Sequence, residues 1–128
     1  MAKKRANTVI AGLLIDPANK SIQEVNVRYD EHCSVLKSMY ENLQCSCVDV
    51  GRRCVEYLPS APQDDLWFDD EGSYSDCEYA FQLPYCVPLI GRGLILGYDG
   101  NGNCTSHHLT AEDIEMLKQT IVFHRREV

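Results

Sequence analysis

Short apolar runs, each ended by a turn-forming sequence, constrain the fold of this chain more than any other feature. Residues 8–15 form an apolar run of strand length that Asp16-Pro17 ends, and residues 21–27 follow as the second strand of a predicted hairpin. The same patterns predict further strands over 47–50, 54–58, 66–68, 79–83 and 90–98. Because strands outnumber helices and most connections have the length of hairpin turns, the sequence predicts an α+β fold with a mainly antiparallel sheet.

Two segments have the three- and four-residue apolar spacing of amphipathic helices instead. The first helix is predicted over 31–43, with Asp30 as its N-cap. The second is predicted over 110–123, where Thr110 and Asp113 have the spacing of a capping box. Together with the strands, these segments predict one sheet-based domain that carries two amphipathic helices.

The length of 128 residues corresponds to one domain, which we place at 8–124, between a flexible basic tail at 1–7 and a second tail at 125–128. Apolar residues make up 45% and charged residues 24%, which is typical of a soluble globular protein rather than a disordered or fibrous one. The basic start and the following apolar run resemble a secretory signal, but Asp16-Pro17 ends the run without a small-residue cleavage site. We therefore expect a cytoplasmic protein.

The negative charge is unevenly distributed along the chain. Residues 1–64 hold eight basic and eight acidic side chains, whereas residues 65–128 hold four basic and eleven acidic ones, so the whole net charge of −7 arises in the second half. Binding to a nucleic-acid backbone depends on lysine and arginine side chains that displace counterions, and this charge opposes it. An acidic surface instead suits a basic protein partner, although it also serves solubility alone.

The acidic segment 64–71 contains five carboxylates among eight residues, and it is the main candidate for a partner-binding site. The residues that we expect to contact a partner are Asp65, Asp69, Asp70 and Glu71. Two alternatives use the same carboxylates: a hydrolase with a pair of acids, and a site for a hard cation. The spacing does not fit the calcium-binding loop pattern, and a solvated hairpin with a charged edge would give the same composition.

A second candidate site centres on Gly91-Arg92-Gly93. Glycine within a strand indicates a bulge or a close approach to the backbone, and an arginine there can receive a phosphate or carboxylate through two hydrogen bonds. Arg52 and Arg53 are expected to assist in neutralising such an anion. The alternative interpretation is a bulged strand in which Arg92 pairs with a nearby acid.

Cysteine and histidine give no recognisable catalytic or metal-binding pattern. The seven cysteines are an odd number without the spacing of a structural zinc site, so we expect free thiols and neither a metal nor a cofactor. No nucleophile motif is present, and the pair His107-His108 precedes a helix N-terminus, where exposed histidines are common. The sequence therefore predicts no catalytic residues.

Four stretches together resemble a family of small proteins of unknown function carried by bacterial phages, plasmids and integrated elements. They are Leu13–Ile22, Asp64–Gly72, Ile90–Gly97 and Leu109–Ile114. The resemblance spans most of residues 13–123 and implies an accessory protein of a mobile element in the bacterial cytoplasm. Proteins of this class often act by binding, either to a host protein or to a nucleotide signal of antiviral defence.

The leading hypothesis is a non-enzymatic protein, expected to be a homo-oligomer, that inhibits a host or antiviral-defence protein through its acidic surface. The first alternative is that it sequesters a small anionic, nucleotide-like defence signal. The second is a small hydrolase that uses the carboxylates of segment 64–71. None of these hypotheses involves a membrane or direct contact with a nucleic-acid backbone.

Overall fold

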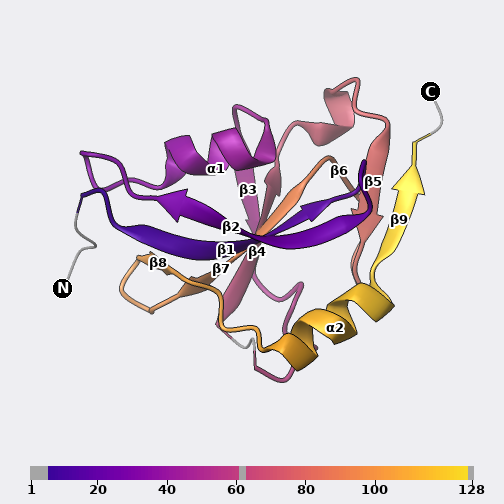
Figure 1. The fold of residues 1–128 in the computed structure, drawn as a ribbon. Coiled ribbons are helices and arrows are strands. Elements are labelled where there is room, and N and C mark those ends of the chain that lie inside the picture. The colour runs from indigo at the N-terminus through magenta and orange to yellow at the C-terminus, as the bar shows by residue number, and fades with distance from the viewer. Residues whose placement is uncertain (1–5, 61–62, 127–128) are drawn as a thin grey trace.

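The computed structural model describes residues 6–60 and 63–126, in which one large sheet forms the centre of the molecule (Figure 1). The strand order in this sheet is β2-β1-β7-β4-β3, and β8 pairs with Gly97 and Tyr98 at the C-terminal end of β7. Every pairing is antiparallel. The strands are β1 (Val9–Asp16), β2 (Ser21–Arg28), β3 (Val48–Gly51), β4 (Asp64–Asp69), β7 (Gly93–Tyr98) and β8 (Cys104–Thr105).

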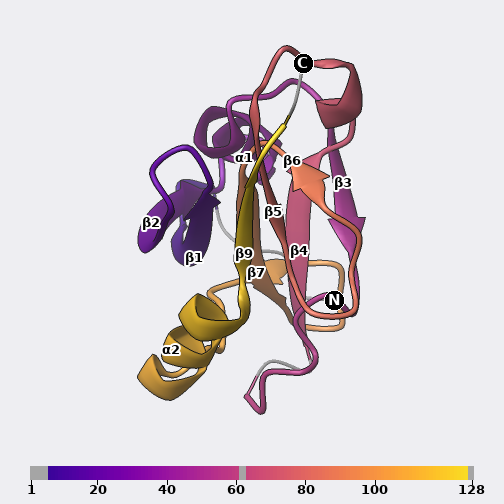
Figure 2. The ribbon, with the colours of Figure 1, turned by 90° about the vertical axis from the view of Figure 1, so that its right-hand side faces the viewer.

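A second, smaller antiparallel sheet has the order β6-β5-β9 and lies beside the large one (Figure 2). Its strands are β5 (Tyr79–Gln82), β6 (Leu89–Ile90) and β9 (Val122–Arg125). Two α-helices, α1 (Leu36–Leu43) and α2 (Ala111–Thr120), and the short 3₁₀-helix η1 (Gly72–Tyr74) complete the fold. In Figure 1, α1 lies above the large sheet and α2 below it.

The central strands β1 and β7 of the large sheet are mostly buried, and a separate apolar core lies against each face of the sheet. On the α1 face, Leu94 and Leu96 of β7 pack with Met39 and Leu43 of the helix. On the opposite face, Ile95 packs in a second core with residues from α2 and the smaller sheet. Because successive residues of a strand point to opposite faces, a strand buried on both sides has a continuous apolar sequence. This explains why β1 and β7 appear in the sequence as unbroken apolar runs.

The structure confirms the predicted α+β character, the mainly antiparallel pairing and the first hairpin. The register of the hairpin is uninterrupted from Val9 opposite Arg28 to Asp16 opposite Ser21. The capping box of α2 is also present: the Thr110 hydroxyl accepts from the Asp113 N–H, and the Asp113 carboxylate accepts from the Thr110 N–H. Local side-chain chemistry was sufficient to locate these features.

Both predicted helices are shorter than expected. The first begins at Leu36 rather than near 31, because the Asp30 carboxylate accepts from the backbone N–H groups of His32 and Ser34 and holds the preceding residues in a turn. Asp30 is therefore not the N-cap of this helix. The prediction that the second helix reaches 123 was also wrong, because the backbone becomes extended at Ile121 and continues as β9.

Two strand predictions also need correction. Residues 54–58 form a turn in which Val55 and Leu58 are buried, so their apolar spacing reflects packing against the core rather than a strand. The predicted strand 90–98 is divided between the two sheets, with Leu89–Ile90 paired to β5 and Gly93–Tyr98 in the large sheet. Each half satisfies its backbone hydrogen bonds with a different neighbour.

Most of the predicted N-terminal tail, residues 1–5, lies outside the described residues, as do Ala61-Pro62 and the last two residues of the chain. At the C-terminus β9 extends to Arg125, and Arg126 donates to the carbonyls of Ser73 and Ser75. Within the described part of the chain, no helix is long and apolar enough to cross a membrane.

Candidate functional site

Strand β4 separates the acidic segment into two groups. Asp64 and Asp65 begin the strand and are buried, whereas Asp69, Asp70 and Glu71 lie at its other end and are half-buried or exposed. Six residues of strand span about 17 Å. The predicted partner-binding residues are therefore not brought together, because Asp65 lies at the opposite end of β4 from the other three. We call Asp64 and Asp65 the buried acidic end.

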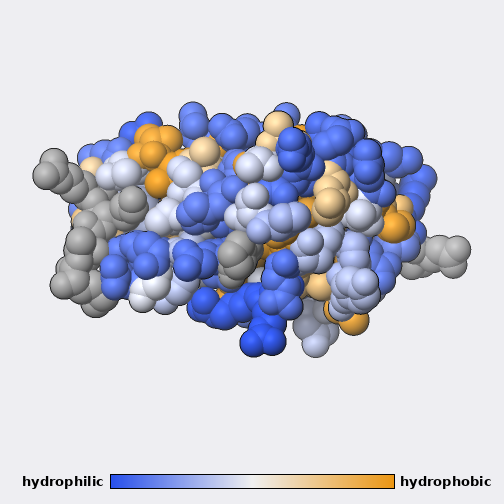
Figure 3. Space-filling view, turned by 90° about the horizontal axis from the view of Figure 1, so that it is seen from below, coloured by the Kyte–Doolittle hydropathy of each residue, from blue (hydrophilic) through white to orange (hydrophobic). Residues whose placement is uncertain are grey.

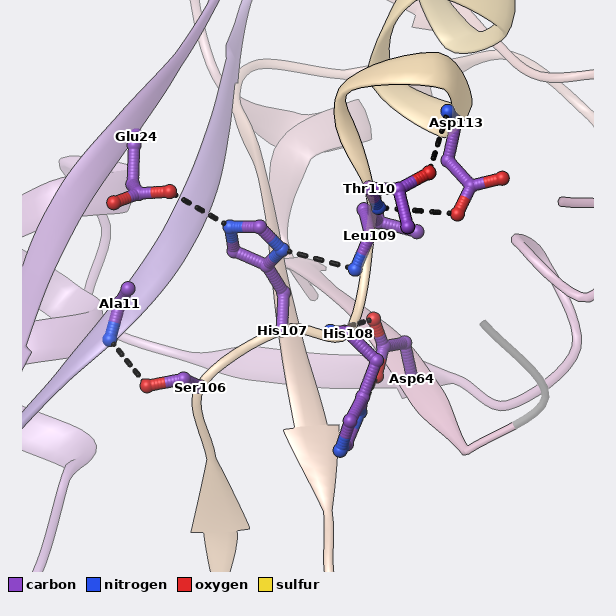
Figure 4. Close-up of polar contacts among 9 residues, drawn as sticks. All are labelled: Ala11, Glu24, Asp64, Ser106, His107, His108, Leu109, Thr110 and Asp113. Atoms are coloured by element: carbon purple, nitrogen blue, oxygen red, sulfur yellow. Dashed lines mark hydrogen bonds and ion pairs between the residues drawn. The ribbon is translucent and has the colours of Figure 1, made fainter. Parts of the chain in front are cut away.

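Asp64 is paired with His108, which comes from the segment before α2 (Figure 4). Asp64 Oδ1 lies 2.6 Å from His108 Nδ1, and Asp64 Oδ2 accepts from the His108 backbone N–H at 2.8 Å. The Asp64 side chain has 0% exposure. An ionised carboxylate only accepts hydrogen bonds, so Nδ1 carries the proton and the far side of the ring points away from Asp64. A buried carboxylate without such donors would be strongly unfavourable.

Gly97 makes room for this pair on strand β7. A Cβ atom at this position would lie 2.7 Å from His108 Cε1 and 2.4 Å from Thr105 Oγ1. The absence of a side chain lets the segment that carries His108 pack directly against the strand. The glycine that interrupts an otherwise apolar run is thus explained by close packing.

The neighbouring His107 has a different environment. Its side chain is 6% exposed, its Nδ1 accepts from the Leu109 N–H, and its Nε2 lies 3.1 Å from Glu24 Oε2 (Figure 4). Because Nδ1 accepts, the proton of the neutral ring is on Nε2, facing the carboxylate. Both nitrogens are occupied, so His107 fixes the segment to β2.

The second buried carboxylate, Asp65, is paired with Arg52. Arg52 Nη1 lies 3.4 Å from Asp65 Oδ2, and the guanidinium carbon lies 5.5 Å from the centre of the Tyr98 ring. Burial raises the pKa of Asp65 above its usual value, and the positive charge of Arg52 opposes this rise. Asp64 and Asp65 are adjacent in a strand and point to opposite faces, each with its own cationic or donor partner. They do not form the facing pair of acids that a glycosidase-like mechanism uses.

Arg92 is held away from Arg52 and Arg53. Its Nη2 lies 3.6 Å from Asp16 Oδ2, and its Nη1 donates to the carbonyl oxygen of Asn42 at 3.1 Å. The cleft beside it measures about 210 Å³ and includes the carboxylates of Asp16 and Asp69. Arg52 and Arg53 line other clefts, so the structure does not assemble the predicted anion site at Gly91-Arg92-Gly93.

At the far end of β4, three acidic residues are followed along the chain by an exposed aromatic side chain. Tyr74, in η1, is 88% exposed, and Asp70 and Glu71 directly precede this helix. We call Asp69, Asp70, Glu71 and Tyr74 the exposed acidic end. Glu71 also lies 3.5 Å from the thiol of Cys47, and this contact raises the pKa of that thiol.

The seven cysteines all have free thiols. Burial raises the pKa of Cys104 to about 11, and burial also raises the pKa of Cys45. Among residues 6–60 and 63–126, no three His, Cys, Asp or Glu side chains come together as metal ligands. Four of the thiols, those of Cys45, Cys54, Cys86 and Cys104, pack against the two apolar cores.

The sequence suggested for His108 only an exposed position before a helix, not its contact with Asp64, and gave no reason to single out Tyr74. His108 lies 44 residues from Asp64 along the chain, and no local spacing pattern links them. Tyr74 lies in a turn-like sequence in which any aromatic residue could equally be buried. The one available signal for His108 was Gly97, since a glycine inside a buried strand indicates that another group comes close.

Comparisons of this chain with protein-family models, with curated proteins and with solved structures found no match.

Proposed function

We propose that this protein acts by binding a basic surface of a partner protein through its exposed acidic end, without catalysing a reaction. The observation that carries the proposal is Tyr74, an 88% exposed aromatic side chain next to carboxylates that have no arginine or lysine partner among the described residues. Tyrosine is enriched at the energetic centre of protein interfaces, and surrounding charges speed association with an oppositely charged surface.

The backbone of the exposed acidic end is fixed, which further supports a binding role. The Asp69 carboxylate accepts from the Glu71 N–H, and the Ser75 hydroxyl donates to the Gly72 carbonyl. Gly72 is packed so closely that a Cβ atom would lie 2.7 Å from the Ile90 carbonyl oxygen. Arg126 anchors the same segment from the C-terminus. A surface that is already ordered loses less conformational entropy when a partner binds.

The side that carries α2 offers less for such a contact. Seen from below, the described residues there present scattered hydrophobic groups within a mostly hydrophilic surface (Figure 3). A protein interface usually needs a compact apolar or aromatic centre with a polar rim. The resemblance to proteins of mobile elements points to a host or antiviral-defence protein as the partner, whose function the bound protein would inhibit.

The experiment is affinity capture from a bacterial lysate with the wild type and three variants, quantified by mass spectrometry. The first carries Asp69→Asn, Asp70→Asn and Glu71→Gln, and the second carries Tyr74→Ser. The control carries Glu31→Gln, Glu41→Gln and Glu115→Gln, three exposed acids elsewhere that give the same net charge. We expect a basic protein that the wild type and the control retain and both site variants lose. Capture of the same proteins by all four chains would contradict the proposal.

A further inference from the structure

A separate cleft of about 930 Å³ lies between the turn that follows β3 and the loop that joins β5 to β6. We call it the arginine cleft, and the residues used below are Arg52, Arg53, Cys54, Tyr57, Tyr85 and Cys86, all of which line it. Its volume is in the range of sites for small organic molecules. None of these residues belongs to the exposed acidic end.

The inner wall of the arginine cleft is apolar and fixed. The Tyr57 hydroxyl is 2.8 Å from Thr120 Oγ1, which holds the aromatic ring in place. Burial, reinforced by the adjacent Cys86 thiol, raises the pKa of Cys54 to about 12. That thiol is therefore protonated and uncharged at neutral pH, so it adds no negative charge to the cleft. The wall suits the uncharged, flat part of a ligand.

The rim of the cleft supplies positive charge. Arg53 is exposed and has no ion pair among the described residues, whereas Arg52 is oriented by Asp65 and keeps further N–H groups available. Glu56 is the one carboxylate among the lining residues, and Arg52 is already paired with Asp65, so Arg53 is the guanidinium group of the cleft that remains without an ion pair. An unpaired guanidinium beside an apolar wall suits a phosphate or carboxylate, which it binds through two parallel hydrogen bonds.

Tyr85 adds an aromatic surface at the same rim. Its side chain is 100% exposed, and its backbone has φ = 64°, which a bulky residue rarely adopts. The loop is nevertheless ordered by hydrogen bonds from Gln82 Nε2 to the Cys86 carbonyl and from the Cys86 N–H to the Leu83 carbonyl. Strained positions of this kind are concentrated at binding sites. The loop thus holds an aromatic ring in solvent, where it can stack on a flat ligand.

We propose that the arginine cleft binds a small organic anion with a flat ring system, such as a nucleoside monophosphate. Arg53 receives the anionic group, Tyr85 stacks on the ring, and the wall formed by Tyr57 and the two thiols excludes water. A longer nucleic acid is a poor candidate, because its other phosphates would meet the acidic surface of a chain with a net charge of −7. This site is independent of the partner surface proposed above.

The test is calorimetric titration of the full chain with AMP, adenosine and inorganic phosphate. We expect AMP to bind more tightly than either of the other two, because only AMP carries both the anion and the ring. Arg53→Gln should weaken AMP binding about tenfold or more, as expected for a lost charged hydrogen bond. Tyr85→Asn should weaken it about fivefold, since asparagine tolerates the positive φ but removes the ring.

The control variant is Arg28→Gln, which removes an exposed arginine of β2 and should leave AMP binding unchanged. The triple variant at the exposed acidic end should also bind AMP normally, so failure of one proposal does not imply failure of the other. No binding at millimolar AMP, or equal binding by wild type and Arg53→Gln, would overturn the cleft proposal. Equal binding of adenosine and AMP would refute the role of the anion, and equal binding of phosphate and AMP would refute that of the ring.

Discussion

The two ends of β4 contain similar sequences but use their carboxylates differently. At the buried acidic end, Asp64 is bound by His108 and Asp65 by Arg52, so both carboxylates have a partner within the molecule. At the exposed acidic end, Asp70 and Glu71 face solvent beside Tyr74. Both ends contain two adjacent aspartates, but the presence of a donor within reach decides whether an acid stabilises the fold or remains available to a partner.

The largest effect on stability should come from removing the buried carboxylate of Asp64. Asp64→Ala leaves the His108 N–H and ring nitrogen without their acceptor, and we expect a loss of about 2–3 kcal/mol in the free energy of unfolding. Urea denaturation measures this loss. Asp70→Ala is the matched change at the other end and should cost less than about 0.5 kcal/mol. A loss of equal size in both variants would show that the two ends do not differ.

The packing beside His108 should be nearly as sensitive. Gly97→Ala places a methyl group against Thr105 Oγ1 and His108 Cε1, and we expect a cost of about 1–3 kcal/mol from overpacking. Thermal unfolding measures the change, and faster amide hydrogen exchange at residues 105–109 would locate it. Unchanged stability together with unchanged exchange would contradict the close approach at Gly97.

The Arg52–Asp65 pair should have a smaller effect that depends on pH. Because Arg52 is largely exposed, Arg52→Gln should cost about 1 kcal/mol at pH 7. The pKa of Asp65 is already raised by burial, so its ionised form is disfavoured in the folded state, and loss of Arg52 disfavours it further. The difference between wild type and variant should therefore shrink as pH falls through the pKa of Asp65 and the carboxyl becomes protonated. Denaturation curves of both proteins at pH 7 and in the acid range test this. A stability difference between wild type and Arg52→Gln that grows on acidification would contradict the prediction.

The smallest effect on stability should follow neutralisation of the exposed acidic end. Asp69→Asn, Asp70→Asn and Glu71→Gln together remove repulsion between adjacent like charges, so the free energy of unfolding should change by less than about 0.5 kcal/mol. The same variant should associate more slowly with a basic partner, and its association rate should depend less on salt concentration. Stopped-flow or surface-based kinetics at two salt concentrations measures both quantities once the partner is captured. An unchanged association rate with unchanged salt dependence would contradict the claim that the exposed acidic end binds the partner.

The sequence was informative where local chemistry decides the structure, as in the β1–β2 hairpin and the Thr110–Asp113 capping box. It was misleading where tertiary contacts decide, because residues 54–58 were predicted as a strand but form a turn that buries Val55 and Leu58, which are three residues apart. Likewise, Ile121 is buried although its backbone is extended, so apolar spacing did not locate the end of α2.

The candidate sites were less predictable than the fold. Acidic segment 64–71 was found from composition, but its division by β4 depends on which carboxylates meet distant donors such as Arg52 and His108. Arg52 and Asp65 are 13 residues apart in the sequence, and Asp64 and His108 are 44 residues apart, so neither pair follows a periodic pattern that the sequence would reveal. The arginine cleft was missed as a unit for the same reason, because Arg53 and Tyr85 become neighbours only when two loops fold together.

The most direct test of the difference between the ends compares two double variants by urea denaturation. Asp64→Asn with Asp65→Asn and Asp69→Asn with Asp70→Asn alter the same residue type in the same number and change the net charge equally. We predict that the first pair lowers the free energy of unfolding by about 2 kcal/mol, because asparagine has one acceptor oxygen, whereas the buried Asp64 uses both of its oxygens to bind His108. The second pair should leave it within about 0.5 kcal/mol of the wild type. Equal losses, or a larger loss in the second pair, would contradict the assignment of one end to stability and the other to binding.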